Sequence, residues 1–290
     1  MTHSRFASVR ATRDVLVRHG LQTKKSLGQH FLVDDNIVGR IMALADLSGD
    51  ESVLEVGPGI GTLTVPLCEA AGSVVAVEQD RRLMPILTEL AEECGNLTIV
   101  HADAATVAPE QLVTPQGPPV ALVANLPYSV AATVVLRYFE LLPSLRFAVV
   151  MVQAEVADRM TAHPGTKAYG SYTVKLGLRA RPAGRFAVAP GCFMPPPRVD
   201  SAVVRLEREP GIGDAALVAD AAAAAAAVAA FAQRRKTIRN SLRSTLSADA
   251  ATLERALADA GIDPGRRAET LDVRSYVLLG EKLREYGLLP

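Results

Sequence analysis

Short apolar runs recur through the first half of the chain, and most intervals between them carry apolar residues at helical spacing. The helical patterns lie at 62–71, 81–93 and 129–142, and the apolar runs are 52–56, 73–77, 97–100, 120–124 and 147–151. Strands that are apolar throughout and alternate with helices are typical of a parallel sheet covered on both faces. The pattern therefore predicts a doubly wound α/β domain, whose ligand crevice should lie at the carboxyl ends of the strands.

The character of the chain changes after residues 195–214. The remainder is rich in Ala, Leu and Arg at helical spacing and has no further convincing strand. We predict a linker over 208–213 and three regions, namely a basic N-terminal arm (1–23), an α/β domain (24–207) and a small helical domain (208–290). The arm either adds contacts to phosphates or is a disordered tail; its charged residues are Arg5, Arg10, Arg13, Asp14, Arg18 and, just beyond it, Lys24 and Lys25.

Composition narrows the class of protein. Of the 290 residues, 49% are hydrophobic and 21% are charged, which is ordinary for a globular enzyme. The formal net charge is zero, so a polyanionic partner has to bind local basic patches. Cys68, Cys94 and Cys192 lack a Cys-x-x-Cys spacing, which argues against a zinc site and a disulfide scaffold and suits a reducing cytosol. With no signal-like or membrane-spanning run in sight, we expect a soluble, cytoplasmic protein.

A glycine-rich turn provides the first chemical signal. In "LEVGPGIGTLT" (54–64) a strand runs into Gly57, Gly59 and Gly61, and a helix follows. Glycines at this place let the backbone approach a ligand closely and expose amides at the start of the helix. The spacing is G-x-G-x-G and not the G-x-G-x-x-G of dinucleotide sites, and a purely structural turn remains an alternative.

Two acidic residues follow the next two strands. Glu78 comes directly after "VVAV", where a carboxylate can accept hydrogen bonds from both hydroxyls of a ribose. Asp103, in "TIVHADA", can accept from the exocyclic amine of an adenine, while the amide of Ala104 can donate to the ring. Each acid could instead cap a helix. Taken with the glycine turn, the two acids predict an adenosine that lies across the strand ends.

The run "VALVANLPYSV" (120–130) ends a buried strand on the bare amide of Asn125. If S-adenosylmethionine lies across the first three strands, its methyl group should face this fourth strand. The Asn125 side-chain oxygen and the Leu126 carbonyl would then accept the N–H groups of a ring amine and orient its lone pair for attack. Tyr128 offers a face on which a planar base can stack. Because the sulfonium is already an activated leaving group, we expect no metal.

At this point the chain resembles the small-subunit ribosomal RNA adenine dimethyltransferase family, close to full length. The matching segments are "KKSLGQHFLVD" (24–34), "VLEVGPGIGTLT" (53–64), "VAVEQD" (75–80), "HADA" (101–104), "NLPY" (125–128), "KAYGSYTV" (167–174), "FMPPPRVDSAVVRL" (193–206) and "FAQRRKTIRNSL" (231–242). The resemblance implies a Rossmann-like methyltransferase that dimethylates N6 of two adjacent adenines near the 3′ end of 16S RNA, converting S-adenosylmethionine to S-adenosylhomocysteine. It also implies cofactor contacts from His30, Leu32, Gly57, Glu78, Asp103 and Asn125, and a Phe193 that stacks on the target base opposite Tyr128. Packing of Phe193 on the proline loop is the alternative.

A basic stretch predicts the RNA-binding surface independently of the resemblance. No acid lies between Phe231 and Ala248, and the basic residues are Arg234, Arg235, Lys236, Arg239 and Arg243. On one helix, Arg235, Arg239 and Arg243 form an i, i+4, i+8 row, where like charges repel each other unless a polyanion binds. We therefore expect recognition of RNA shape and phosphates rather than of base edges.

Three other functions stay open at this stage. One is a large-subunit RNA adenine methyltransferase of the macrolide-resistance type, which shares the catalytic domain. A second is a ribosome-assembly factor whose catalysis is secondary. A dinucleotide-dependent oxidoreductase is the third, and the glycine spacing, Asp103 and "NLPY" count against it. The expected partner is the small ribosomal subunit or its precursor, bound by a monomer and not at a membrane.

Overall fold

The computed structural model describes residues 3–21, 30–209 and 217–289. Lys24, Lys25 and most of the predicted linker lie outside these residues. The helices are α1 (Val9–Arg18), α2 (Asp35–Ala45), α3 (Thr64–Ala70), α4 (Met84–Cys94), α5 (Ala131–Leu141), α6 (Ala154–Met160), α7 (Ser171–Gly177), α8 (Leu217–Phe231), α9 (Ile238–Leu246), α10 (Ala250–Asp259) and α11 (Val273–Glu285). The strands are β1 (Phe31–Leu32), β2 (Ser52–Val56), β3 (Ser73–Glu78), β4 (Leu97–His101), β5 (Ala121–Asn125), β6 (Phe147–Gln153), β7 (Ala180–Val188), β8 (Phe193–Met194) and β9 (Ser201–Arg208).

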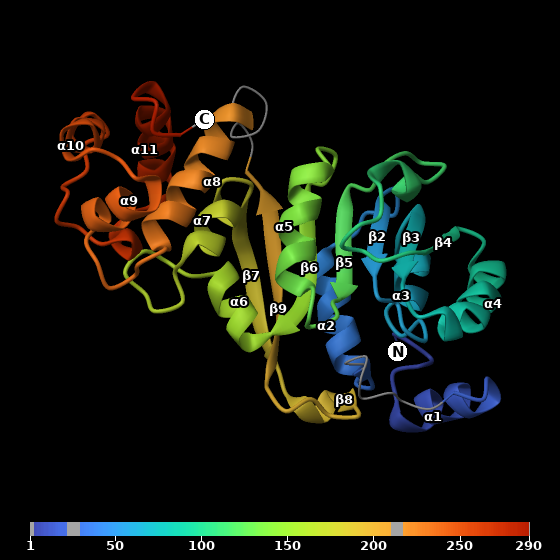
Figure 1. The fold of residues 1–290 in the computed structure, drawn as a ribbon. Helices are drawn as coiled ribbons and strands as arrows, with labels where there is room; N and C mark the ends of the chain where they lie inside the picture. Colours follow the sequence, from blue (N-terminus) through green and yellow to red (C-terminus); the bar gives the residue numbers. More distant parts are fainter. Residues whose placement is uncertain (1–2, 22–29, 210–216, 290) are drawn as a thin grey trace. The chain divides into compact units, whose positions relative to one another are not determined.

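One large sheet organises the N-terminal part of the fold. Within the described residues its strand order is β4-β3-β2-β5-β6-β9-β7, and β1 pairs with β8 in a separate two-stranded sheet (Figure 1). The strands from β4 to β6 run parallel to their neighbours. β9 runs antiparallel to β6, so the sheet is mixed, and the parallel arrangement expected from the five apolar runs holds for β2 to β6. Strand order reverses between β2 and β5, which creates a topological switch point at their carboxyl ends.

The five strands expected from apolar runs are confirmed as β2 to β6, and the three helical patterns become α3, α4 and α5. Every residue of β2 and β3 is buried. Since successive side chains of a strand point to opposite faces, this pattern means that both faces of the sheet are covered. The sequence analysis did not identify β7 and β9, because their arginines and the Pro and Gly of β7 weaken the strand signal.

The chain divides into two compact units. The first, the catalytic-site unit, contains residues 1–157 and 182–208, and the second, the helical unit, contains 158–181 and 209–290. This division differs from the single boundary expected at 207/208. Residues 158–181 join the helical unit because they pack there: the hydroxyl of Tyr169 donates to the carbonyl of Leu271 at 2.8 Å. A sequence pattern could not show this, since the segment lies between two strands of the sheet.

Residues 3–21 are folded into the catalytic-site unit, in contrast to the expected arm. Ser8 caps α1, and Val15 and Leu16 are buried in the core of the unit. The backbone amides of His3 and Ser4 donate to the carboxylate of Asp35 at the start of α2. The apolar positions of α1 and this cap explain why a segment rich in arginine is nevertheless ordered.

The alanine-rich helix α8 lies against α11 in the helical unit. Gly280 of α11 explains the closeness of the contact, because a Cβ placed there would lie 2.4 Å from the backbone nitrogen of Ala223. Small residues on both helices therefore let the two backbones approach. Neither α8 nor any other helix of the described residues is long and apolar enough to cross a membrane.

Candidate active site

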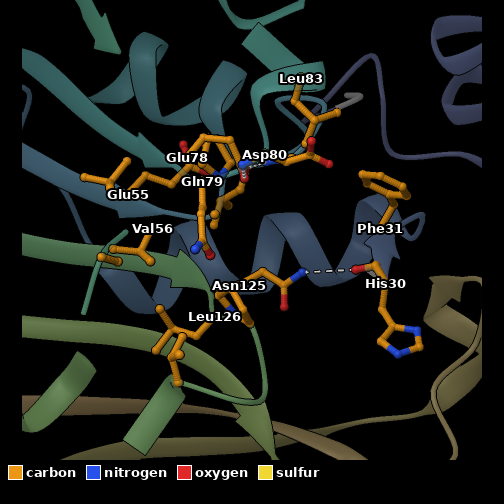
Figure 2. Close-up of a pocket in the computed structure, with 18 of the residues that line it drawn as sticks. His30, Phe31, Glu55, Val56, Glu78, Gln79, Asp80, Leu83, Asn125 and Leu126 are labelled. Carbon is orange, nitrogen blue, oxygen red and sulfur yellow. Dashed lines mark hydrogen bonds between the residues drawn. The ribbon is translucent and has the colours of Figure 1, made fainter. Parts of the chain in front are cut away.

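A pocket of about 410 Å³ opens at the carboxyl ends of β2, β3, β4 and β5, where the ligand crevice was expected (Figure 2). Gly57 at the end of β2 has φ of 68°, which favours glycine. A Cβ at Gly57 would also lie 3.2 Å from the Pro127 ring. The glycine turn and the "NLPY" turn, distant in sequence, therefore form neighbouring walls of one pocket.

Glu78 is 8% exposed and lines this pocket from the end of β3. Its two oxygens accept hydrogen bonds from the amides of Gly59 (3.3 Å) and Asp80 (2.8 Å). Burial raises the pKa of Glu78, and these amide bonds oppose the rise. The carboxylate thus ties the glycine turn to the loop after β3, and each oxygen keeps a lone pair for a further donor.

Asp103 and Ala104 line the pocket from the loop after β4. Oδ1 of Asp103 accepts from the amide of Ala105 at 2.8 Å, so the alternative role as a local cap is realised for that oxygen. Oδ2 of Asp103 and the amide of Ala104 have no hydrogen-bond partner within the described residues. This pair of one acceptor and one donor matches the edge of an adenine, which has an exocyclic amine beside a ring nitrogen acceptor.

Asn125, the last residue of β5, has an amide of fixed orientation. Its Nδ2 donates to the backbone carbonyl of His30 at 3.4 Å, and Figure 2 shows the side-chain oxygen turned away from His30. Since a carbonyl can only accept, the nitrogen has to face His30. Oδ1 of Asn125 and the carbonyl of Leu126 have no donor among the described residues, and both residues line the pocket. Two neighbouring acceptors are thus available for one amine.

Tyr128 also lines the pocket, and its ring is already stacked on one side. The rings of His30 and Tyr128 lie 5.6 Å apart between centroids, with 26° between their planes. The Tyr128 hydroxyl bonds to Ser201 Oγ at 2.6 Å, and burial raises its pKa. Two separate contacts therefore fix the ring that was expected to stack on a base.

His30 and Leu32 line the same pocket, whereas Phe193 does not. Leu32 pairs with Phe193 across the β1–β8 ladder, and Phe193 is only 3% exposed. The side chain of Phe193 packs in the hydrophobic core of the catalytic-site unit. All the other residues expected to bind the cofactor are brought together: Gly57, Gly59, Glu78, Asp103, Ala104 and Asn125.

A buried acid that lines the pocket was not expected from the sequence. Glu55 lies in β2, is 1% exposed, and its Oε2 has no hydrogen-bond partner in the described part of the chain. Burial raises its pKa to about 8, and the nearby Glu78 carboxylate adds to the rise. A single acid inside the apolar run "SVLEV" was the available signal, because a lone charged residue in a buried strand is costly unless a ligand or partner compensates it.

In the helical unit the basic residues separate into two groups. The turn 232–236 and the Thr237 cap divide α8 from α9, so the expected continuous row of Arg235, Arg239 and Arg243 is wrong at Arg235. The guanidinium of Arg234 donates to the carbonyls of Lys167 and Tyr169, and Arg239 pairs with Glu254 at 3.3 Å. Of the basic residues from 234 to 243, Arg235, Lys236 and Arg243 are exposed, and their side chains have no partner among the described residues.

Known proteins resemble the chain over nearly its full length. The family model described as "Ribosomal RNA adenine dimethylase" matches residues 20–284. The "Ribosomal RNA small subunit methyltransferase A" of Magnetococcus marinus is 42% identical over 267 residues, which cover 91% of this chain and 93% of that protein. A protein of the same name from Bacillus cereus (strain AH187) is 38% identical over 285 residues, covering 96% and 97%.

Two solved structures share the fold. The dimethyladenosine transferase from Plasmodium falciparum has a TM-score of 0.74 and 24% identity, and the match covers 89% of this chain and 98% of that one. The 23S rRNA methyltransferase ErmE has a TM-score of 0.66 and 29% identity, with 88% and 99% covered. Both matches include the helical unit as well as the sheet, since they span most of each chain.

Proposed function

The chain belongs to the ribosomal RNA adenine dimethylase family, and on that premise we propose that its substrate is 16S RNA in the small ribosomal subunit or its precursor. The enzyme transfers methyl groups from S-adenosylmethionine to the N6 amines of two adjacent adenines near the 3′ end. The observation that carries the chemistry is the pair of acceptors without donors, Asn125 Oδ1 and the Leu126 carbonyl, at the end of β5.

The hydrogen-bonding groups that line the pocket fit S-adenosylmethionine. Glu78 offers two carboxylate oxygens to the ribose, and Asp103 and the Ala104 amide offer an acceptor and a donor to the adenine. The buried Oε2 of Glu55, which has no partner within the described residues, suits a cationic ligand. When bound, the cofactor supplies a methyl group already activated as a sulfonium.

The protein's task is then to hold the target amine. Asn125 Oδ1 and the Leu126 carbonyl each accept one N–H of adenine N6, which draws the nitrogen lone pair out of conjugation with the ring. The same two bonds fix the direction of the lone pair for attack on the methyl carbon. Because Pro127 has no N–H, the turn brings no competing donor at that residue.

Tyr128 stacks on the target base with the ring face that His30 leaves uncovered. Stacking of a base on an aromatic side chain is worth about 1–3 kcal/mol and tolerates any base, so it holds the adenine without reading sequence. Phe193, buried in the core of its unit, has no part in this arrangement. The stack is therefore His30, Tyr128 and adenine, in that order.

Phosphates of the RNA bind the helical unit at the turn before α9. Arg235 and Lys236 are exposed there, and the amide of Ile238 donates to the carbonyl of Arg266 at 2.7 Å, which brings the loop carrying Arg267 beside them. Arg267 is exposed, and its side chain has no partner among the described residues. Arg243 lies further along α9. In contrast, Arg234 has a structural role, because its guanidinium donates hydrogen bonds to carbonyls of the 167–169 loop.

The proposal of the small subunit as substrate rests on relatives named "Ribosomal RNA small subunit methyltransferase A". These relatives are 38–42% identical along almost the entire chain. A monomer in the cytoplasm is the form that this role requires, because the substrate is a much larger particle. The large-subunit methyltransferase remains the alternative, supported by the structural similarity to ErmE.

Transfer of labelled methyl groups tests the proposal. Small subunits from cells that lack the modification, large subunits and naked 16S RNA are each incubated with the protein, and the modified nucleoside is identified by mass. We expect dimethyladenosine in the small subunits and none in the large ones. Label in the large-subunit RNA would support the alternative, and tight subunit binding without any label would indicate an assembly factor.

A further inference from the structure

His30 contacts three parts of the pocket at once. Its ring Nδ1 bonds to the carbonyl of Pro195 at 2.7 Å, its ring stacks on Tyr128, and its backbone carbonyl accepts from Asn125 Nδ2. The two residues that are proposed to hold the target base, Asn125 and Tyr128, therefore both depend on the position of one residue. This residue directly precedes β1 and does not belong to the large sheet.

The β1–β8 ladder explains why the carbonyl of His30 is available. The amide of Val33 donates to the carbonyl of Cys192 at 2.8 Å, across the ladder. In an antiparallel pair the backbone groups of alternate residues point toward the partner strand, so those of residues 30 and 32 point away from β8. The carbonyl of His30 thus faces outward, and Asn125 meets it there.

The imidazole anchors this outward-facing backbone. His30 directly precedes β1, and Pro195 directly follows β8. At this position the ladder provides no backbone hydrogen bond, and the bond from Nδ1 to the Pro195 carbonyl takes its place. Because a carbonyl only accepts, Nδ1 carries the proton, and the side chain acts as a donor.

We propose that His30 is a positioning residue for methyl transfer, whose Nδ1–H bond to Pro195 holds the backbone carbonyl that orients the Asn125 amide. With that carbonyl in place, Asn125 has to present Oδ1 to the target amine. Without it, the amide can rotate and present Nδ2, which is a donor and repels the N–H groups of the substrate. This inference rests on the proposed transfer to adenine N6.

Two substitutions at His30 distinguish the effect of losing the hydrogen-bond donor from the effect of losing the aromatic ring. The side-chain nitrogen of asparagine can occupy nearly the place of Nδ1, so H30N keeps a donor for Pro195 and loses the ring. H30F keeps an aromatic ring against Tyr128 and loses the donor. The exposed His163, whose side chain has no partner among the described residues, provides the control H163A.

Single-turnover methyl transfer to unmodified small subunits is measured for the four proteins, with cofactor affinity from calorimetry. We expect H30F to lose at least tenfold in rate while its cofactor Kd stays within threefold, H30N to transfer at least threefold faster than H30F, and H163A to stay within threefold of the wild type. An H30F rate equal to that of the wild type, or an H30N rate as low as that of H30F, would overturn the proposal.

A second measurement keeps the inference separate from the proposed function. The side-chain amide signals of Asn125 are assigned in nitrogen-15 spectra by comparison with N125A, and their hydrogen exchange is followed. Faster exchange in H30F than in H30N and the wild type supports the orienting bond even if the wild type transfers no methyl group. Equal exchange in all three proteins would contradict it.

Discussion

Replacing Asn125 by alanine should separate chemistry from stability. The substitution removes one hydrogen bond of the folded state, the 3.4 Å contact from Nδ2 to the His30 carbonyl. A neutral bond contributes about 0.5–1.5 kcal/mol, and this long one belongs at the lower end of that range. The free energy of unfolding should therefore fall by roughly 1 kcal/mol or less.

The loss in rate should be much larger, because Oδ1 is the acceptor that faces the amine as positive charge develops on it. Removing one preorganised group of this kind costs about 10²–10³ in rate, or about 2.7–4 kcal/mol. Cofactor affinity should change only a few-fold, since the proposed cofactor contacts Glu78 and Asp103 lie at the end of β3 and in the loop after β4. The assay is single-turnover transfer to unmodified small subunits, with urea unfolding and calorimetry on the same protein.

The exposed Asn36 on α2, which lies outside the pocket, gives the matched control Asn36→Ala. A transfer rate for Asn125→Ala within threefold of this control would refute the assignment of Oδ1. A cofactor Kd that rises as much as the rate falls would refute it too, because Asn125 would then be a cofactor contact alone.

Three further predictions test other parts of the account. Glu78→Gln should weaken cofactor binding about tenfold or more in calorimetry, since the neutral amide has only one oxygen that can accept hydrogen bonds. An unchanged Kd would indicate that the ribose binds elsewhere. Glu55 has a folded pKa of about 8, above the usual 4.5, so its contribution to stability is full below pH 4.5 and is lost as pH rises to 8. The free energy of unfolding of the wild type relative to Glu55→Gln should thus fall by up to about 1.4 kcal/mol per pH unit between these values in urea titrations, and a constant difference would contradict the burial argument. Arg235→Ala should flatten the salt dependence of RNA binding by about 0.7–0.9 units of slope. Arg234→Ala should keep the wild-type slope and lower the melting temperature of the protein. An equal flattening in both variants would indicate that Arg234 also binds RNA phosphates.

Residues that directly follow buried strands could be assigned to the site from the sequence alone. Glu78, Asp103 and Asn125 could be located because each directly follows a buried strand, and parallel strands bring their carboxyl ends to one edge. The structure confirms that these strand ends line one pocket. The roles of the three side chains toward a ligand stay predictions.

Other features depend on contacts that no local pattern encodes. Phe193 is an aromatic residue in a matching motif, yet its burial follows from the β1–β8 ladder. Arg234 and Arg235 are adjacent and chemically identical, and only the distant carbonyls of Lys167 and Tyr169 distinguish them. The break before α9 was readable in principle, because Thr237 is a good N-cap, but the row of arginines was the stronger pattern.

The central claim is that Asn125 Oδ1 and the Leu126 carbonyl hold the amine that is methylated. The most direct test is a structure of the protein with S-adenosylhomocysteine and an adenosine-containing RNA fragment in the pocket. We expect adenine N6 within hydrogen-bond distance, about 2.7–3.2 Å, of both oxygens, with the base stacked on Tyr128. A base whose N6 contacts neither oxygen, with the cofactor in place, would contradict the account.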